Sequence, residues 1–99
     1  MIMTKPHERF SSVVLAGHKG LGFEVPFDPG RQWGRAPVSL RPGRRGHRVS
    51  GTVNGRPFEG AVVGRSRRFF VLVTDGMARA AKLREGSTVR VSLRPREVE

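Results

Sequence analysis

Two segments rich in β-branched and aromatic residues, residues 48–53 and 56–63, lie on either side of Asn54 and Gly55. A two-residue type I′ turn requires positive φ angles at both central positions, and Asn-Gly is well suited to adopt them. We therefore predict a β-hairpin in the middle of the chain. Residues 67–73 predict a third strand after a short glycine-containing link, so the whole region is expected to be a β-meander.

The turn also predicts the pairing within the hairpin. Val53 should face Arg56 in a hydrogen-bonded pair, and Gly51 should then face Phe58, whose ring can cover the glycine. Because Pro57 has no N–H to donate, its outer side should face solvent or a sheet edge. The core side of the hairpin is expected to include Val49, Val53 and Phe58.

Two further strand-like segments precede the hairpin. Residues 10–16 and 22–27 are predicted to pair through a turn at residues 17–20. Pro26 should mark either a sheet edge or the end of the second strand. Apolar side chains alternate along the second strand, which should place one set on the same face. This set is Phe23, Val25 and Phe27.

One helix and one strand are predicted after the meander. Residues 74–83 can form a short helix with Asp75 as its N-cap and with Met77, Ala80 and Ala81 on one face, and Gly86 closes the segment. Residues 89–93 then alternate as a strand that ends at Pro95. Its inward-facing side chains should be Val89, Val91 and Leu93.

The segments between the second strand and the hairpin give weaker signals. Residues 28–30, Asp-Pro-Gly, favour a turn, and residues 31–34 favour a short helical turn or an irregular loop. Residues 36–40 can form a short extended piece. Residues 41–47 contain two glycines, one proline and three arginines, and we expect them to form an exposed, mobile basic loop.

Length and composition limit the organisation of the protein. A chain of 99 residues is expected to form one domain over residues 1–99, with flexible ends at residues 1–8 and 95–99. The strands favour a mostly β fold, either a small barrel or a sandwich. There is no cysteine, no apolar segment long enough to cross a membrane and no signal-like N-terminus, so we expect a soluble, cytoplasmic protein. The oligomeric state stays open.

Charge is the most unusual global feature of the sequence. Nineteen Lys and Arg residues against eight Asp and Glu residues give a net charge of +11, and residues 30–57 contain no acid. A field of this sign attracts polyanions and makes nucleic-acid binding dependent on salt. A GC-rich coding sequence would explain why most cations are Arg, but not why acids are scarce.

The basic residues suggest one candidate site in two groups. Closely spaced guanidinium groups on flexible backbone can contact phosphates without reading bases. No aromatic residue lies within residues 41–47 to stack on a base, which weakens a single-strand interpretation. A solvated basic surface is the simpler alternative. The candidate residues are Arg41, Arg44, Arg45, Arg48, Arg65, Arg67 and Arg68.

Trp33 suggests an alternative site. A lone Trp beside a glycine can plug the end of a small barrel, or it can line a ligand mouth together with Phe27 and Arg31. In the second case the protein would be a small-molecule or protein-interaction module.

Catalysis and cofactor binding have little support. The three histidines lie far apart in the sequence without metal-binding spacing, and the serines lack a nucleophile-elbow context. The glycine-rich residues 17–22 precede a strand, whereas a phosphate-binding glycine loop precedes a helix. We therefore expect a binding domain without a catalytic residue, metal or cofactor.

Four segments resemble a bacterial domain-of-unknown-function family, number nineteen-oh-five. They are Gly22–Asp28, Trp33–Gly34, Val49–Phe58 and Gly86–Leu93. The Val-Ser-Gly-Thr-Val-Asn-Gly-Arg-Pro-Phe segment is the most distinctive. The resemblance implies a small closed or split β-barrel with one short α-helix before the last strand. Members occur alone or joined to a segment resembling bacteriocin-protection proteins, and the family supplies no established activity or site residue.

The chain departs from the family pattern in two places. Residues 41–47 form an Arg/Pro/Gly-rich insertion in a link that is usually shorter, and Ser87 stands where an acidic residue commonly follows the glycine. Both departures make this chain more basic, so a polyanion role would belong to this member and not to the family.

Overall fold

The computed structural model describes residues 8–17 and 20–96 of the chain. It contains seven strands and two short helices within these residues. They are β1 (Glu8–Gly17), β2 (Gly20–Val25), α1 (Pro29–Trp33), β3 (Val38–Arg41), β4 (Arg44–Val53), β5 (Arg56–Arg65), β6 (Arg68–Val73), α2 (Asp75–Ala81) and β7 (Thr88–Pro95).

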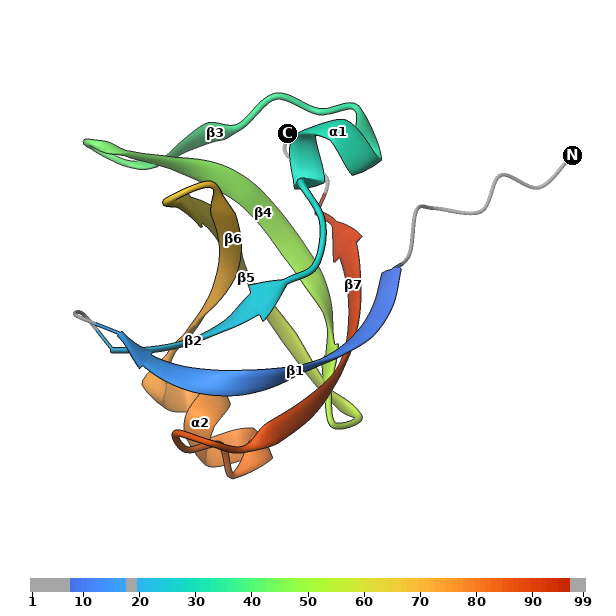
Figure 1. Cartoon of the computed structure of the whole chain (residues 1–99), viewed down its shortest axis with the longest axis vertical. Coiled ribbons are helices and arrows are strands. Elements are labelled where there is room, and N and C mark those ends of the chain that lie inside the picture. Colours follow the sequence, from blue (N-terminus) through green and yellow to red (C-terminus); the bar gives the residue numbers. More distant parts are fainter. Residues whose placement is uncertain (1–7, 18–19, 97–99) are drawn as a thin grey trace, which may run out of the picture.

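Six of the strands close into a barrel (Figure 1). The antiparallel order β4-β5-β6-β2-β1-β7 returns to β4, because β4 pairs with both β5 and β7. The remaining strand, β3, pairs only with the first residues of β4. The predicted fold class is confirmed as a mostly β, closed small barrel with one short helix, α2, before the last strand.

The central hairpin has the predicted turn and register. Asn54 and Gly55 have φ angles of 51° and 80°, Val53 pairs with Arg56, and Gly51 pairs with Phe58. The structure also shows why this position is a glycine. A β-carbon on Gly51 would collide with the carbonyl oxygen of Ser92, so glycine permits the close approach of β7.

The barrel interior is filled by side chains from all six strands. The fully buried members include Val14, Phe23, Val49, Val62, Val71, Val89 and Leu93. As predicted, the alternating side chains of β7 point inward. The two helices lie at opposite ends of the barrel in Figure 1. Pro29 and Trp33 of α1 and Met77 of α2 are buried, and Trp33 and Met77 belong to the hydrophobic core.

Several predicted boundaries need correction. Thr74, not Asp75, is the N-cap of α2, since its hydroxyl oxygen accepts a hydrogen bond of 3.1 Å from the Met77 N–H. Ala78 and Ala81 pack on the core, whereas Ala80 is exposed. Met77, Ala78 and Ala81 share one face because residues three and four positions apart lie on the same side of a helix.

The edges and ends of the sheet were predicted in part. β2 ends before Pro26 as expected, but it lies between β1 and β6 and is not an edge. Within the ends predicted to be flexible, Glu8 is the first residue of β1, and Pro95 is buried as the last residue of β7. Residues 1–7, 18–19 and 97–99, including half of the predicted first turn, lie outside the described residues.

The prediction of an irregular loop at residues 41–47 is wrong. β3 and β4 form a hairpin whose two-residue turn includes Gly43, with a φ angle of 79°. Gly46 lets β4 pass close to β5, because a β-carbon there would collide with the Val62 carbonyl oxygen. Leu40 and Val63 side chains approach the same position from outside the barrel core. Of the two glycines that indicated a loop, Gly43 therefore forms the turn and Gly46 permits close strand packing.

No helix in the described part of the chain is long and apolar enough to span a membrane.

Candidate functional site

Two arginine-rich hairpins project from the same end of the β4–β5 ladder. Pairing runs from Val53 and Arg56 at one end to His47 and Val62 at the other. Beyond that pair, β4 extends back to Arg44 and β5 continues to Arg65. The turns of the β3–β4 and β5–β6 hairpins therefore lie at the same end of the molecule, on the upper left in Figure 1.

These hairpins carry six of the seven predicted arginines. Arg41, Arg45, Arg65, Arg67 and Arg68 are exposed, and Arg44 is half-buried. We call these six residues the arginine tips. Among the ion pairs of the described residues, one carboxylate contacts them: Glu24 Oε2 lies 3.8 Å from Arg68 Nε in an exposed pair that is worth little.

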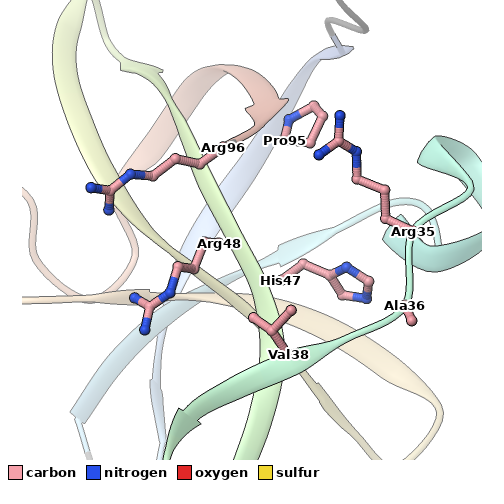
Figure 2. Close-up of a pocket in the computed structure, with 7 residues that line it drawn as sticks. All are labelled: Arg35, Ala36, Val38, His47, Arg48, Pro95 and Arg96. Atoms are coloured by element: carbon pink, nitrogen blue, oxygen red, sulfur yellow. The ribbon is translucent and has the colours of Figure 1, made fainter. Parts of the chain in front are cut away.

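The seventh predicted arginine, Arg48, lies in β4 four residues after Arg44 and borders a cavity. The cavity has a volume of about 290 Å³ and opens where two strands share one edge of β4 (Figure 2). Pairing with β3 ends at Gly46, and pairing with β7 begins at Val49. The lining residues are Arg35, Ala36, Val38, His47, Arg48, Pro95 and Arg96.

Arg96 is a cavity residue that the sequence did not single out. Pro95 pairs with Val49, and the Arg96 N–H donates a hydrogen bond of 2.9 Å to the Arg48 carbonyl oxygen. Arg48 and Arg96 are therefore direct neighbours across two strands. Only the pairing of β4 with β7 reveals this, and no local sequence signal predicts pairing between strands so distant in the chain.

His47 lies beside the same cavity, on the side of β4 opposite to the Arg48 side chain (Figure 2). Its ring lies over α1, close to Gly30. Partial burial lowers the pKa of His47 below its ordinary value, and the charge of Asp28 partly opposes this effect. A lowered pKa favours the neutral imidazole near neutral pH.

The alternative site around Trp33 is mostly filled by aromatic packing. Trp33 is 9% exposed and contacts Phe27 edge-on, with ring centroids 5.4 Å apart. Phe27 in turn packs against Phe10 at 6.0 Å. Arg31 is exposed on α1. The Trp thus plugs one end of the barrel, and the cavities beside Arg48 and beside Gly55 are both lined by other residues.

The Trp33 indole has one unusual property. Its Nε1 atom is buried and has no hydrogen-bond partner among the described residues.

Residues 8–17 and 20–96 contain no cluster of three or more acidic or histidine side chains that could hold a metal ion.

Comparison with known families identifies the family of this chain. Residues 10–93 match the model of a family described as "Domain of unknown function (DUF1905)". The search of curated proteins found no match. The family match covers the whole barrel apart from the first residues of β1 and the last residues of β7.

Proposed function

This chain belongs to the DUF1905 family, and we propose that it is a non-enzymatic binding domain that holds nucleic acid or another polyanion on its arginine tips. The observation that carries this proposal is that two hairpins distant in sequence present their arginines at the same end of the barrel. We propose that the domain has this role in the bacterial cytoplasm.

Charge and exposure support the proposal. The six guanidinium groups of the arginine tips face a single nearby carboxylate, Glu24, among the described ion pairs. Arg side chains bind phosphates through planar, paired hydrogen bonds and stay charged at every physiological pH. Several such contacts release counterions from a nucleic acid and supply most of its non-specific affinity.

The same geometry favours backbone contacts over base reading. No aromatic side chain lies in the turns of the two hairpins, residues 42–43 and 66–67, so stacking on bases has no platform there. Binding should therefore depend on phosphate density and salt, with little preference for base sequence.

The test is fluorescence anisotropy of labelled duplex DNA, single-stranded DNA and RNA at low and at near-physiological salt. The first variant combines Arg41→Ala, Arg44→Ala and Arg45→Ala. If the arginine tips bind phosphates, this variant should weaken binding about tenfold or more and should reduce the slope of log affinity against log salt by about two to three.

A charge-matched variant controls for net charge. Arg56, Arg79 and Arg84 are exposed and lie at the other end of the barrel, beside the Asn54–Gly55 turn and α2. Replacing these three with Ala removes the same charge and should leave binding within about twofold. Equal losses in the two triple variants would reduce the arginine tips to part of a generally basic surface.

A further inference from the structure

The cavity beside Arg48 contains a charge arrangement that strand pairing alone does not favour. Val49 of β4 pairs with Pro95, the last residue of β7. Because the two strands are antiparallel, the next pair along them is Arg48 opposite Arg96. Like charges placed directly opposite each other on neighbouring strands destabilise a sheet. Figure 2 shows both side chains extending to the same side of β4.

The side chains paired across the neighbouring strands compensate this repulsion only in part. Arg48 faces Ala61 on its other side, so no acid lies within that row. In the next row, Arg94 faces Ser50 and Ser50 faces Glu59. Glu59 reaches diagonally to Arg96, with 3.4 Å between its Oε2 and the arginine Nε. Among the ion pairs of the described residues, this is the one carboxylate contact made by Arg48, Arg94 or Arg96.

The cavity adds two features to these charges. Arg35 and His47 line its other side, so cationic or protonatable groups border it on both sides of β4. The remaining walls are the small apolar side chains Ala36, Val38 and Pro95. A volume of about 290 Å³ lies at the lower limit of small-molecule sites, which suits a small anion and excludes a large ligand.

We propose that this cavity is a binding site for a small phosphate-class anion, either free phosphate or a phosphate monoester, held between the Arg48 and Arg96 guanidinium groups. An anion between the two arginines would replace their repulsion with two charge-assisted interactions. This site needs neither the arginine tips nor nucleic acid, so it does not depend on the function proposed above.

The test compares protein variants in the presence of inorganic phosphate, with sodium chloride at the same ionic strength as the reference. Phosphate should raise the Tm of the unaltered chain above the chloride value, and calorimetry should give its Kd. Arg48→Gln and Arg96→Gln should each weaken phosphate binding about tenfold or more. Arg48→Gln should not lower the Tm in chloride, because it removes a like-charge neighbour. Arg96→Gln also loses its exposed ion pair with Glu59, which is worth little, so its Tm in chloride should change little.

Arg56→Gln provides the matched control, since Arg56 is exposed at the other end of β5. Its phosphate affinity should stay within about twofold of the unaltered chain. The proposal is overturned if phosphate and chloride stabilise the protein equally, or if Arg56→Gln and Arg48→Gln weaken binding by the same factor.

Two further arms identify the ligand source and separate the two proposals. Adenosine monophosphate that binds more tightly than phosphate would identify a phosphate monoester, and equal affinities would identify the phosphate group alone. The triple variant of Arg41, Arg44 and Arg45 should keep phosphate binding whatever its effect on nucleic acid. Loss of phosphate binding in that variant would overturn a separate site in the cavity.

Discussion

The two halves of β4 are held by different neighbours. Residues 49–53 pair with β5 on one edge and with β7 on the other, and Val49 and Val53 fill the barrel core. Residues 44–46 pair with β3, outside the barrel, and carry two arginines. The cavity lies where the first arrangement gives way to the second. One continuous strand thus joins a half that stabilises the fold to a half that presents charge.

Gly51→Ala would test the core half most severely. A methyl group at this position meets the Ser92 carbonyl oxygen, so β7 must move away from β4. Such overpacking should lower the free energy of unfolding by about 3 kcal/mol, measured by urea denaturation. Gly60→Ala is the control, because its β-carbon would lie 3.6 Å from the Phe58 ring in ordinary contact and should cost less than about 1 kcal/mol.

Asn54→Ala tests the turn that joins the core half of β4 to β5. Asn54 has a φ angle of 51°, and its side-chain oxygen accepts a hydrogen bond of 2.8 Å from the Arg90 N–H. Alanine loses the hydrogen bond and strains the turn, so the free energy of unfolding measured by urea denaturation should fall by about 2 kcal/mol. Asn54→Gly loses the hydrogen bond but tolerates the φ angle, and should cost about 1 kcal/mol. Equal losses would mean that the turn conformation contributes nothing.

Gly46→Ala applies the same kind of change to the charged half of β4. The added methyl group would meet the Val62 carbonyl oxygen and the Leu40 side chain. Because β3 pairs only with the first residues of β4 among the described strands, the hairpin can shift with little disturbance of the barrel. We expect a loss of about 1–2 kcal/mol and faster amide hydrogen exchange confined to residues 38–46. Faster exchange throughout β5 and β7 would contradict the separation of the two halves.

The same contrast explains what the sequence could predict. The core half of β4 has alternating valines and an Asn-Gly turn, and both its register and its inward face follow from these local signals. Gly43, in the turn before the charged half, and Gly46, within it, give the same loop signal in the sequence but occur for different reasons. Gly43 adopts a positive φ angle in a turn, whereas Gly46 makes room for β5. The second reason is a tertiary contact, which composition does not reveal.

Of the candidate sites, one could be predicted from local sequence and the other depends on tertiary contacts. The arginine tips were predicted as separate groups, and their location at the same end of the barrel follows from the hairpin register. Arg96 escaped prediction because its neighbour, Arg48, lies 48 positions earlier in the chain. Closure of the barrel brings them together, and this depends on how β7 returns to β4.

His47, at the junction of the two halves, should make stability depend weakly on pH. Burial lowers its pKa in the folded state below the ordinary value of 6.5, so the unfolded chain binds the proton more readily. The contribution of neutral His47 to folding stability is complete above pH 6.5 and is lost as the pH falls below it, because protonation then favours the unfolded chain. Asp28 is the charge that acts on the ring directly, Arg35 lies on the same side of β4, and Arg48 and Arg96 extend to the other side (Figure 2).

His47→Gln cannot gain this proton, so thermal melts from pH 7.5 to 5 should show a smaller decrease in Tm for the variant than for the unaltered chain. We expect this effect to be the smallest of those considered, because the ring is only partly buried and Asp28 favours its protonated form. Repeating the melts with sulfate, whose charge is constant over this range, tests the junction further. An anion in the cavity should favour protonated His47 and reduce the difference between the two proteins at low pH, whereas chloride at the same ionic strength should not.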